Sequence, residues 1–265
     1  MIRWLKIARA EIVRDLKTSL RYPLELGTGI FILYVLFMGM FLGAKVIAGR
    51  ASTALSGNLD GLVIGFVMWF AAMMAINSVS TDIEYESRQG TLEQVYIHAP
   101  SFIGLTWMRA VTHISLGLGA VIFLALLIQL TTQHWLHLTW ATLPATILVF
   151  ALTIAGLCGF GLILGGLSMV LKRIGQLSAL VQFSMLFLAY AVFLPEPWRS
   201  VVAHLPLAGG VFLLKKLFTP GASFADVAGG TAWLALDSAV YVVIGTLVFA
   251  VMERLARKCG MLGHY

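Results

Sequence analysis

Four carboxylates lie close together in one short polar segment of an otherwise apolar chain. Asp82, Glu84, Glu86 and Glu93 all fall between residues 81 and 101, where Arg88 is the only lysine or arginine. A concentration of negative charge attracts and orients a positively charged partner surface. This segment is therefore predicted to contact a partner protein.

The same segment is predicted to form a short, bent helix over Glu84–Tyr96. Gly90 falls near the middle and weakens the helix by about 1 kcal/mol relative to alanine. Thr91 can cap a second turn that begins there, and Pro100 ends the segment. A short helix between two rigid spans is suited to act as a lever that a partner pushes.

Three other ionisable residues lie in or beside apolar runs. Asp237, near the start of the last run, is either a functional group at membrane depth or a carboxylate that reaches water, and we favour the second. His113 is a candidate proton relay. Arg109 is expected to extend its side chain to water at the inner surface.

Phe183, Phe187 and Tyr190 are spaced to share one face of a helix. Such an aromatic stripe either lines a path for an apolar substrate or packs against lipid and neighbouring helices, and packing is the commoner role. The neighbouring amide of Gln182 can form a hydrogen bond across to another helix.

The signatures of several enzyme classes are missing from the chain. Ser168 lacks the GxSxG context of a nucleophile elbow, and the histidines lack the HExxH spacing of a zinc site. Without the GxxxxGK motif followed by Ser or Thr, the chain has no P-loop for ATP. Cys158 and Cys259 show no metal-ligand spacing. We therefore expect no enzyme, catalytic residue, metal or cofactor in this chain.

The composition indicates a membrane protein. Hydrophobic residues make up 60% of the 265 and charged residues only 11%, against about 25% charged in soluble domains. Runs near 20 apolar residues can cross about 30 Å of hydrocarbon. Six such runs predict six transmembrane helices: Leu26–Ala44, Gly61–Val79, Ala110–Leu130, Leu143–Leu171, Leu177–Leu194 and Trp233–Met252. The expected fold class is an all-α integral membrane protein with a single transmembrane domain over residues 1–265.

The distribution of positive charge predicts the orientation. With six spans, 13 of the 18 lysines and arginines fall on the side that holds both termini. Cytoplasmic segments are enriched in these residues, so we expect a multi-pass protein of the cell inner (plasma) membrane with both termini in the cytoplasm. Residues 1–22 are predicted to form a basic amphipathic helix on the membrane surface, or simply a topology anchor. Charge placed in this way suits the lipid bilayer and not nucleic acid.

Residues 195–230 differ from the remaining chain, because they hold four prolines and an apolar core too short to span. We expect an outer re-entrant helical hairpin, which is tolerated at membrane depth where protein covers it or water reaches it. GxxxG patterns allow close helix contact, although this many glycines also produce them by chance. The patterns are Gly39/Gly43, Gly57/Gly61, Gly61/Gly65 and Gly161/Gly165.

The acidic segment also resembles a family signature. The run Glu86-Ser-Arg-Gln-Gly90-Thr-Leu-Glu93, followed by Pro100, resembles the E-x-x-x-G-T-L-E…P pattern of type-2 ATP-binding-cassette (ABC) exporter permeases. This family includes drug and polysaccharide export permeases. The run also stands where that family has it, between spans two and three. The resemblance extends to the amphipathic N-terminal helix, the six spans and the outer hairpin.

The resemblance implies a function and a set of partners. The segment 80–101 would be a coupling helix seated in a groove of a separate ABC ATPase subunit, which would bind ATP and Mg²⁺. Residues 1–22 would be the connecting helix, and 195–230 would cap the pathway. Two permease copies, identical or different, would pair. The coupling residues would be Glu84, Glu86, Gly90, Thr91, Leu92 and Glu93.

The expected function is therefore the permease subunit of an exporter that moves an amphipathic or lipid-linked substrate or a drug at the expense of ATP. Apolar spans with few polar groups favour such a substrate over a small ion. The alternative is a proton-coupled secondary transporter, with Asp237 or His113 as the relay.

Overall fold

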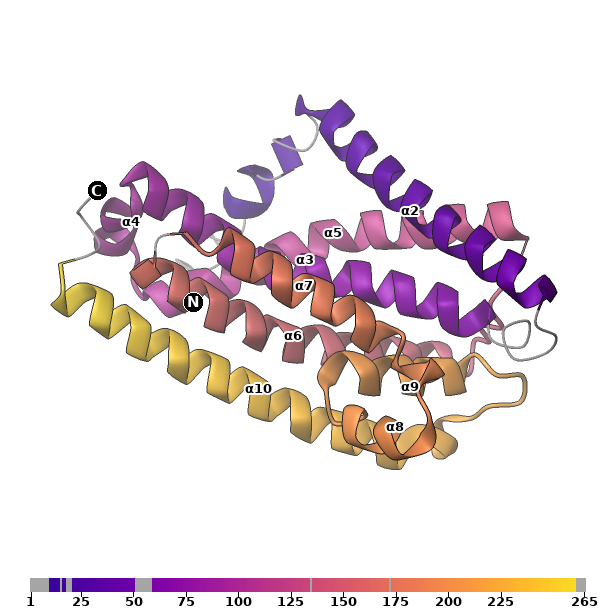
Figure 1. The fold of residues 1–265 in the computed structure, drawn as a ribbon. Coiled ribbons are helices and arrows are strands. Elements are labelled where there is room, and N and C mark those ends of the chain that lie inside the picture. The colour runs from indigo at the N-terminus through magenta and orange to yellow at the C-terminus, as the bar shows by residue number, and fades with distance from the viewer. Residues whose placement is uncertain are drawn as a thin grey trace.

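The computed structural model describes residues 10–14, 16–17, 21–50, 59–133, 135–171 and 173–260, and all regular elements there are helical, as predicted. Figure 1 shows an elongated bundle with α4 at one end and with α8 and α9 at the other. These two ends are called the α4 end and the α9 end. The elements are α2 (Pro23–Arg50), α3 (Leu59–Gln89), α4 (Leu92–His98), α5 (Phe102–Thr132), α6 (Leu143–Leu171), α7 (Gly175–Ala189), the 3₁₀ turn η2 (Ala191–Phe193), α8 (Glu196–Val202), α9 (Pro206–Leu217) and α10 (Phe224–Lys258).

The central helix of the bundle is α3. Of its most apolar stretch of 18 residues, 78% is buried inside the bundle, because α5, α6, α7 and α9 pack around it. The side of α6 that faces away from α3 packs along nearly the whole of α10 (Figure 1). The helix α3 continues ten residues past the predicted end of its span at Val79, since Ser80 and Ile83 remain buried against the bundle.

Among the described residues, five helices are long and apolar enough to cross a membrane, which indicates a multi-pass membrane protein. They are Pro23–Val46, Asp60–Gln89, Phe102–Thr132, Leu143–Leu171 and Phe224–Lys258. The sixth predicted span, Leu177–Leu194, overlaps α7, which has 15 residues and is followed by η2. At 1.5 Å per residue α7 is about 22 Å long, shorter than a 30 Å hydrocarbon core. The sixth span therefore stays a prediction.

Glycines bring α6 into backbone contact with both of its neighbours. A Cβ added at Gly161 would lie 2.9 Å from the Ile76 carbonyl oxygen of α3, so the Gly161/Gly165 pattern is used at this interface. On the other side, a Cβ at Gly159 would overlap the Tyr241 carbonyl of α10, and one at Gly245 would overlap the carbonyl of Gly159. Small residues permit this approach in apolar surroundings, where packing drives helix association.

By contrast, α2 is attached loosely. Only 12% of its most apolar stretch of 18 residues is buried, and Figure 1 shows that one end of α2 slants away from the other helices. Its main anchor is Phe37, whose ring meets that of Phe66 edge-on with centroids 5.2 Å apart. A Cβ at Gly39 or Gly43 would meet open space, so this GxxxG pattern faces no other part of the described chain.

The segment 195–230 contains α8, α9 and the beginning of α10, which starts nine residues before the predicted Trp233. Leu207, Val211 and Leu214 of α9 are buried in the bundle. Helices α8 and α9 therefore fold back onto the α9 end of the bundle. That this hairpin re-enters the membrane stays a prediction. Of the predicted N-terminal helix 1–22, the described residues 10–14, 16–17 and 21 are helical and Tyr22 is not, while residues 1–9, 15 and 18–20 lie outside the described residues.

Candidate functional site

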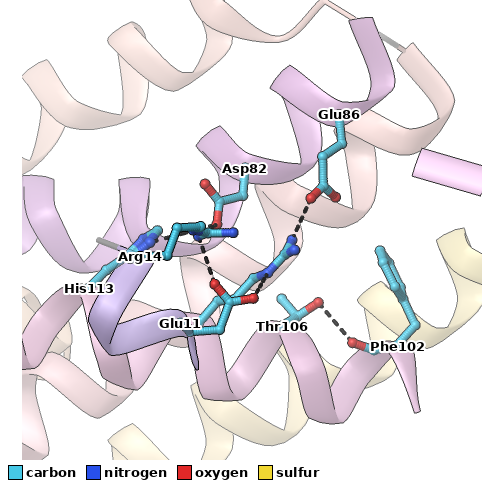
Figure 2. A network of polar contacts seen from close by, with 8 residues as sticks. Glu11, Arg14, Asp82, Glu86, Phe102, Thr106 and His113 are labelled. Carbon is cyan, nitrogen blue, oxygen red and sulfur yellow. Dashed lines mark hydrogen bonds and ion pairs between the residues drawn. The ribbon is translucent and has the colours of Figure 1, made fainter. Parts of the chain in front are cut away.

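A charge network lies at the α4 end, where α3 and α5 meet the N-terminal helical residues. Its centre is Arg109 of α5, whose side chain is only 9% exposed. The guanidinium donates from Nη1 to Glu86 Oε1 at 2.8 Å and from Nε to Glu11 Oε1 at 3.2 Å. Figure 2 shows these two carboxylates approaching from different helices. The expected extension of Arg109 to water is wrong, because the side chain is buried between two acids instead.

The network continues outward from Glu11. Arg14 pairs with the other oxygen of Glu11 at 2.8 Å and lies 4.0 Å from Asp82. Asp82 in turn lies 3.7 Å from Nε2 of His113 (Figure 2). The network thus joins three carboxylates and two arginines from α3, α5 and the N-terminal helical residues, with His113 at its edge.

The spacing of the residues explains how the network forms. Asp82 and Glu86 are four residues apart on α3, and Arg109 and His113 are four residues apart on α5, so each pair lies on one helix face. The two helices run in opposite directions around α4, which places Glu86 against Arg109 and Asp82 against His113. The sequence shows that the residues within each helix are four apart, but not that the two helices bring them together.

Next to the network, Gly90 separates α3 from α4. The residue has φ 71°, a left-handed conformation that costs other residues about 1–2 kcal/mol. After it, the backbone amide of Thr91 donates to the Glu86 carbonyl at 3.1 Å. The predicted single helix over Glu84–Tyr96 is therefore two helices: Glu84 and Glu86 belong to the long α3. Thr91 does occupy the N-cap of α4, but its side chain makes no capping hydrogen bond.

The short helix α4 is fixed to the bundle on one face. Leu92 is 1% exposed and belongs to a cluster that includes Phe102 of α5 and Phe249 of α10. The hydroxyl of Tyr96 donates to Glu253 at 3.2 Å and accepts from Arg257 at 3.3 Å, both on α10. These contacts attach α4 to both α5 and α10.

The other face of this region is exposed. Glu93 in the first turn of α4 is exposed, and Tyr85 and Ile97 are 61% and 69% exposed. Glu84 pairs with Arg88 one turn along α3. Carboxylates next to bare apolar side chains form the kind of mixed surface that protein partners bind.

A second polar contact joins α3 to α7. The side-chain amide of Gln182 donates to Asn77 Oδ1 at 2.7 Å. The indole of Trp69 donates to the backbone carbonyl of Gln182 at 2.9 Å. Sequence reasoning anticipated a cross-helix bond from Gln182 but not its partner Asn77, which is one polar residue in a long apolar run. Both amides are only partly buried, so they remain accessible from outside the bundle.

The aromatic stripe of α7 divides between two environments. Phe183 and Phe187 are 60% and 77% exposed and extend away from the bundle. Tyr190 instead packs against α3, since a Cβ at Gly65 would lie 3.1 Å from its ring. The two phenylalanines are thus available to a substrate, a second chain or lipid, whereas Tyr190 contributes to packing.

Charged residues also gather at the α9 end. Asp237 of α10 lies 3.6 Å from His204, whose side chain is 66% exposed. Burial lowers the pKa of Lys215, and the neighbouring Arg199 guanidinium lowers it further. Arg199 also donates to the carbonyls of Val192 in η2 and of Leu194 directly after it. Within the described residues, no three His, Cys, Asp or Glu side chains form a possible metal site.

Comparison of the chain with protein-family models, with curated proteins and with solved structures gives no match.

Proposed function

We propose that the chain is the membrane permease subunit of an ABC exporter, driven by a separate ATPase subunit. The observation that carries the proposal is the structure around Gly90. A short helix with an exposed acidic and apolar face is joined directly to α3 and bonded through Tyr96 to α10. This is the mechanical arrangement that a coupling element requires, and it contains the sequence that resembles the family signature.

In the proposed mechanism, the ATPase binds the face that includes Glu93 and Ile97. Closure of the ATPase on ATP pushes α4, and the contacts of Leu92 and Tyr96 pass that movement to the spans. The buried Glu11–Arg109–Glu86 network ties the N-terminal helix to the same ends of α3 and α5. The N-terminal helix and α4 then move together when the ATPase closes. No catalytic group in the permease is needed for this step, because the partner hydrolyses ATP.

The proposed path runs beside α7, between two permease copies. Phe183 and Phe187 offer apolar contact there, and the amides of Asn77 and Gln182 offer hydrogen bonds at the same level of the bundle. Apolar surface with a few polar groups suits an amphipathic or lipid-linked substrate. The loosely packed α2 leaves apolar surface that a second copy can cover.

The test is co-expression of the tagged permease with an ABC ATPase subunit from the same genome, followed by purification and ATPase assay in lipid nanodiscs. We expect a stable complex whose formation is lost with Glu93→Lys. The matched control is Glu25→Lys, which reverses an exposed carboxylate at the beginning of α2. Equal complex formation by both variants would falsify the proposed role of α4.

One observation supports the alternative of proton-coupled transport, namely the contact of His113 with Asp82. This alternative predicts that reconstituted permease alone takes up substrate when a proton gradient is applied and that His113→Gln abolishes the uptake. Transport that requires the ATPase and survives collapse of the gradient excludes it.

A further inference from the structure

One face of α10 forms a continuous apolar stripe on the outside of the bundle. Exposed apolar side chains follow this face at helical spacing: Trp233, Leu236, Val240, Ile244, Leu247 and Val251. The opposite face is buried at Leu234, Ser238 and Phe249, because α6 and α9 pack against it. The stripe therefore faces outward, where a membrane protein meets lipid.

The length of the stripe fits the hydrocarbon core of a bilayer. From Trp233 to Val251 it extends about 27 Å at 1.5 Å per residue, and the core is about 30 Å thick. Trp233 stands at one end of the stripe, and tryptophan is enriched where hydrocarbon meets water. With Trp233 at one boundary and Val251 near the other, the last two turns of α10 lie among the lipid headgroups.

Two cations continue the stripe in those last two turns. Arg254 and Lys258 follow Val251 by three and seven residues, so the helix places them on the same outward face, and both are exposed. Within the part of the chain that the structure describes, neither forms an ion pair. Glu253, the only acid in residues 238–258, accepts instead from Tyr96 of α4. The positive charge of the stripe is therefore left for a partner outside the chain.

We propose that Arg254 and Lys258 bind the phosphate headgroup of an anionic membrane lipid, whose acyl chains lie along Leu247 and Val251. A guanidinium can donate two parallel hydrogen bonds to phosphate oxygens, and a lysine adds a compact positive charge.

The contacts of α4 favour a lipid over the proposed ATPase as the partner of this face. Helix α4 is bonded through Tyr96 to Glu253 and Arg257, which lie on a different face of α10. Arg254 and Lys258 instead share their face with the apolar side chains of the stripe. The lipid proposal does not depend on the exporter function.

The test uses the purified full chain with a fluorophore on Cys259, which is exposed beside Lys258, whereas Cys158 is buried. In phosphatidylcholine nanodiscs, quenching by trace phosphatidylglycerol with a nitroxide on one acyl chain is compared with quenching by equally labelled phosphatidylcholine. Each cation near anionic lipid raises the affinity about fivefold, so we expect a preference for phosphatidylglycerol of about 25-fold. High salt should weaken the preference, because it screens exposed charges.

Two variants remove the charges one at a time: Arg254→Gln and Lys258→Gln. Each should lower the preference about fivefold, and the double variant should abolish it. The matched control is Arg88→Gln, which removes an exposed cation that pairs with Glu84 on α3 and should leave the preference unchanged. Monodisperse elution and the melting temperature of the parent identify folded variants.

The proposal is overturned if the parent chain shows no preference for phosphatidylglycerol, or if the double variant keeps it. A double variant that keeps the lipid preference but no longer binds the ATPase subunit would assign this face to a protein contact.

Discussion

Replacement of Arg109 with methionine tests the buried network most directly. The variant keeps a long apolar side chain at a site that is only 9% exposed, but it leaves the carboxylates of Glu11 and Glu86 without the guanidinium between them. Removing one partner of a buried ion pair costs about 3–5 kcal/mol, because the remaining charge is left uncompensated.

The contacts around each carboxylate place the cost near the lower end of that range. Glu11 retains Arg14 at 2.8 Å, so only Glu86 loses its principal partner. We expect a loss of about 3 kcal/mol, which for a chain of this size lowers the melting temperature by roughly 6–12 °C. The control is Arg88→Met, which removes a half-exposed partner of Glu84 and should cost at most about 1 kcal/mol.

The assay is thermal unfolding of the purified variants in one detergent, monitored by tryptophan fluorescence. A double-variant cycle isolates the electrostatic contribution: Arg109→Met should cost much less in a Glu86→Gln background, where no buried charge remains at that position. If Arg109→Met melts within about 2 °C of the parent, or costs the same in both backgrounds, the network does not stabilise this end as argued.

Three further predictions concern packing and the α4 turn. Gly159→Val should lower the melting temperature by at least about 6 °C, because the added carbons overlap the α10 backbone, whereas Gly39→Ala, which meets open space, should leave it within about 2 °C. Gly90→Ala should cost about 1–2 kcal/mol in thermal unfolding, since alanine is strained at φ 71°; Gly90→Asn, which tolerates this conformation better, should cost less. Tyr96→Phe should remove its hydrogen bond to Glu253 and cost about 1 kcal/mol, and it should raise amide hydrogen exchange across α4 without changing exchange in α6.

The sequence was sufficient to predict the helical class and most of the spans, because 20-residue apolar runs have few other solutions. Boundaries were less predictable. Hydropathy ends the second span at Val79, but α3 continues to Gln89 because one face of its polar turns is buried and paired with other helices. The short α7 shows the same limit, since an apolar run gives no sign of where the helix changes into a 3₁₀ turn.

The candidate site was predicted in part. The acidic segment and the special position of Gly90 were visible in the sequence, and so was an acid at Glu86. What Glu86 contacts was not, because Arg109 lies in another helix and Glu11 lies 98 residues before Arg109.

The glycine contacts of α6 have a mechanical consequence. Two helices whose backbones touch cannot slide or tilt past one another without atomic overlap, so α6 is locked to α3 at Gly161 and to α10 at Gly159. We therefore expect these three helices to move together, if they move at all. Among the described helices α2 has the least buried apolar stretch, so a change of helix angle would cost least there.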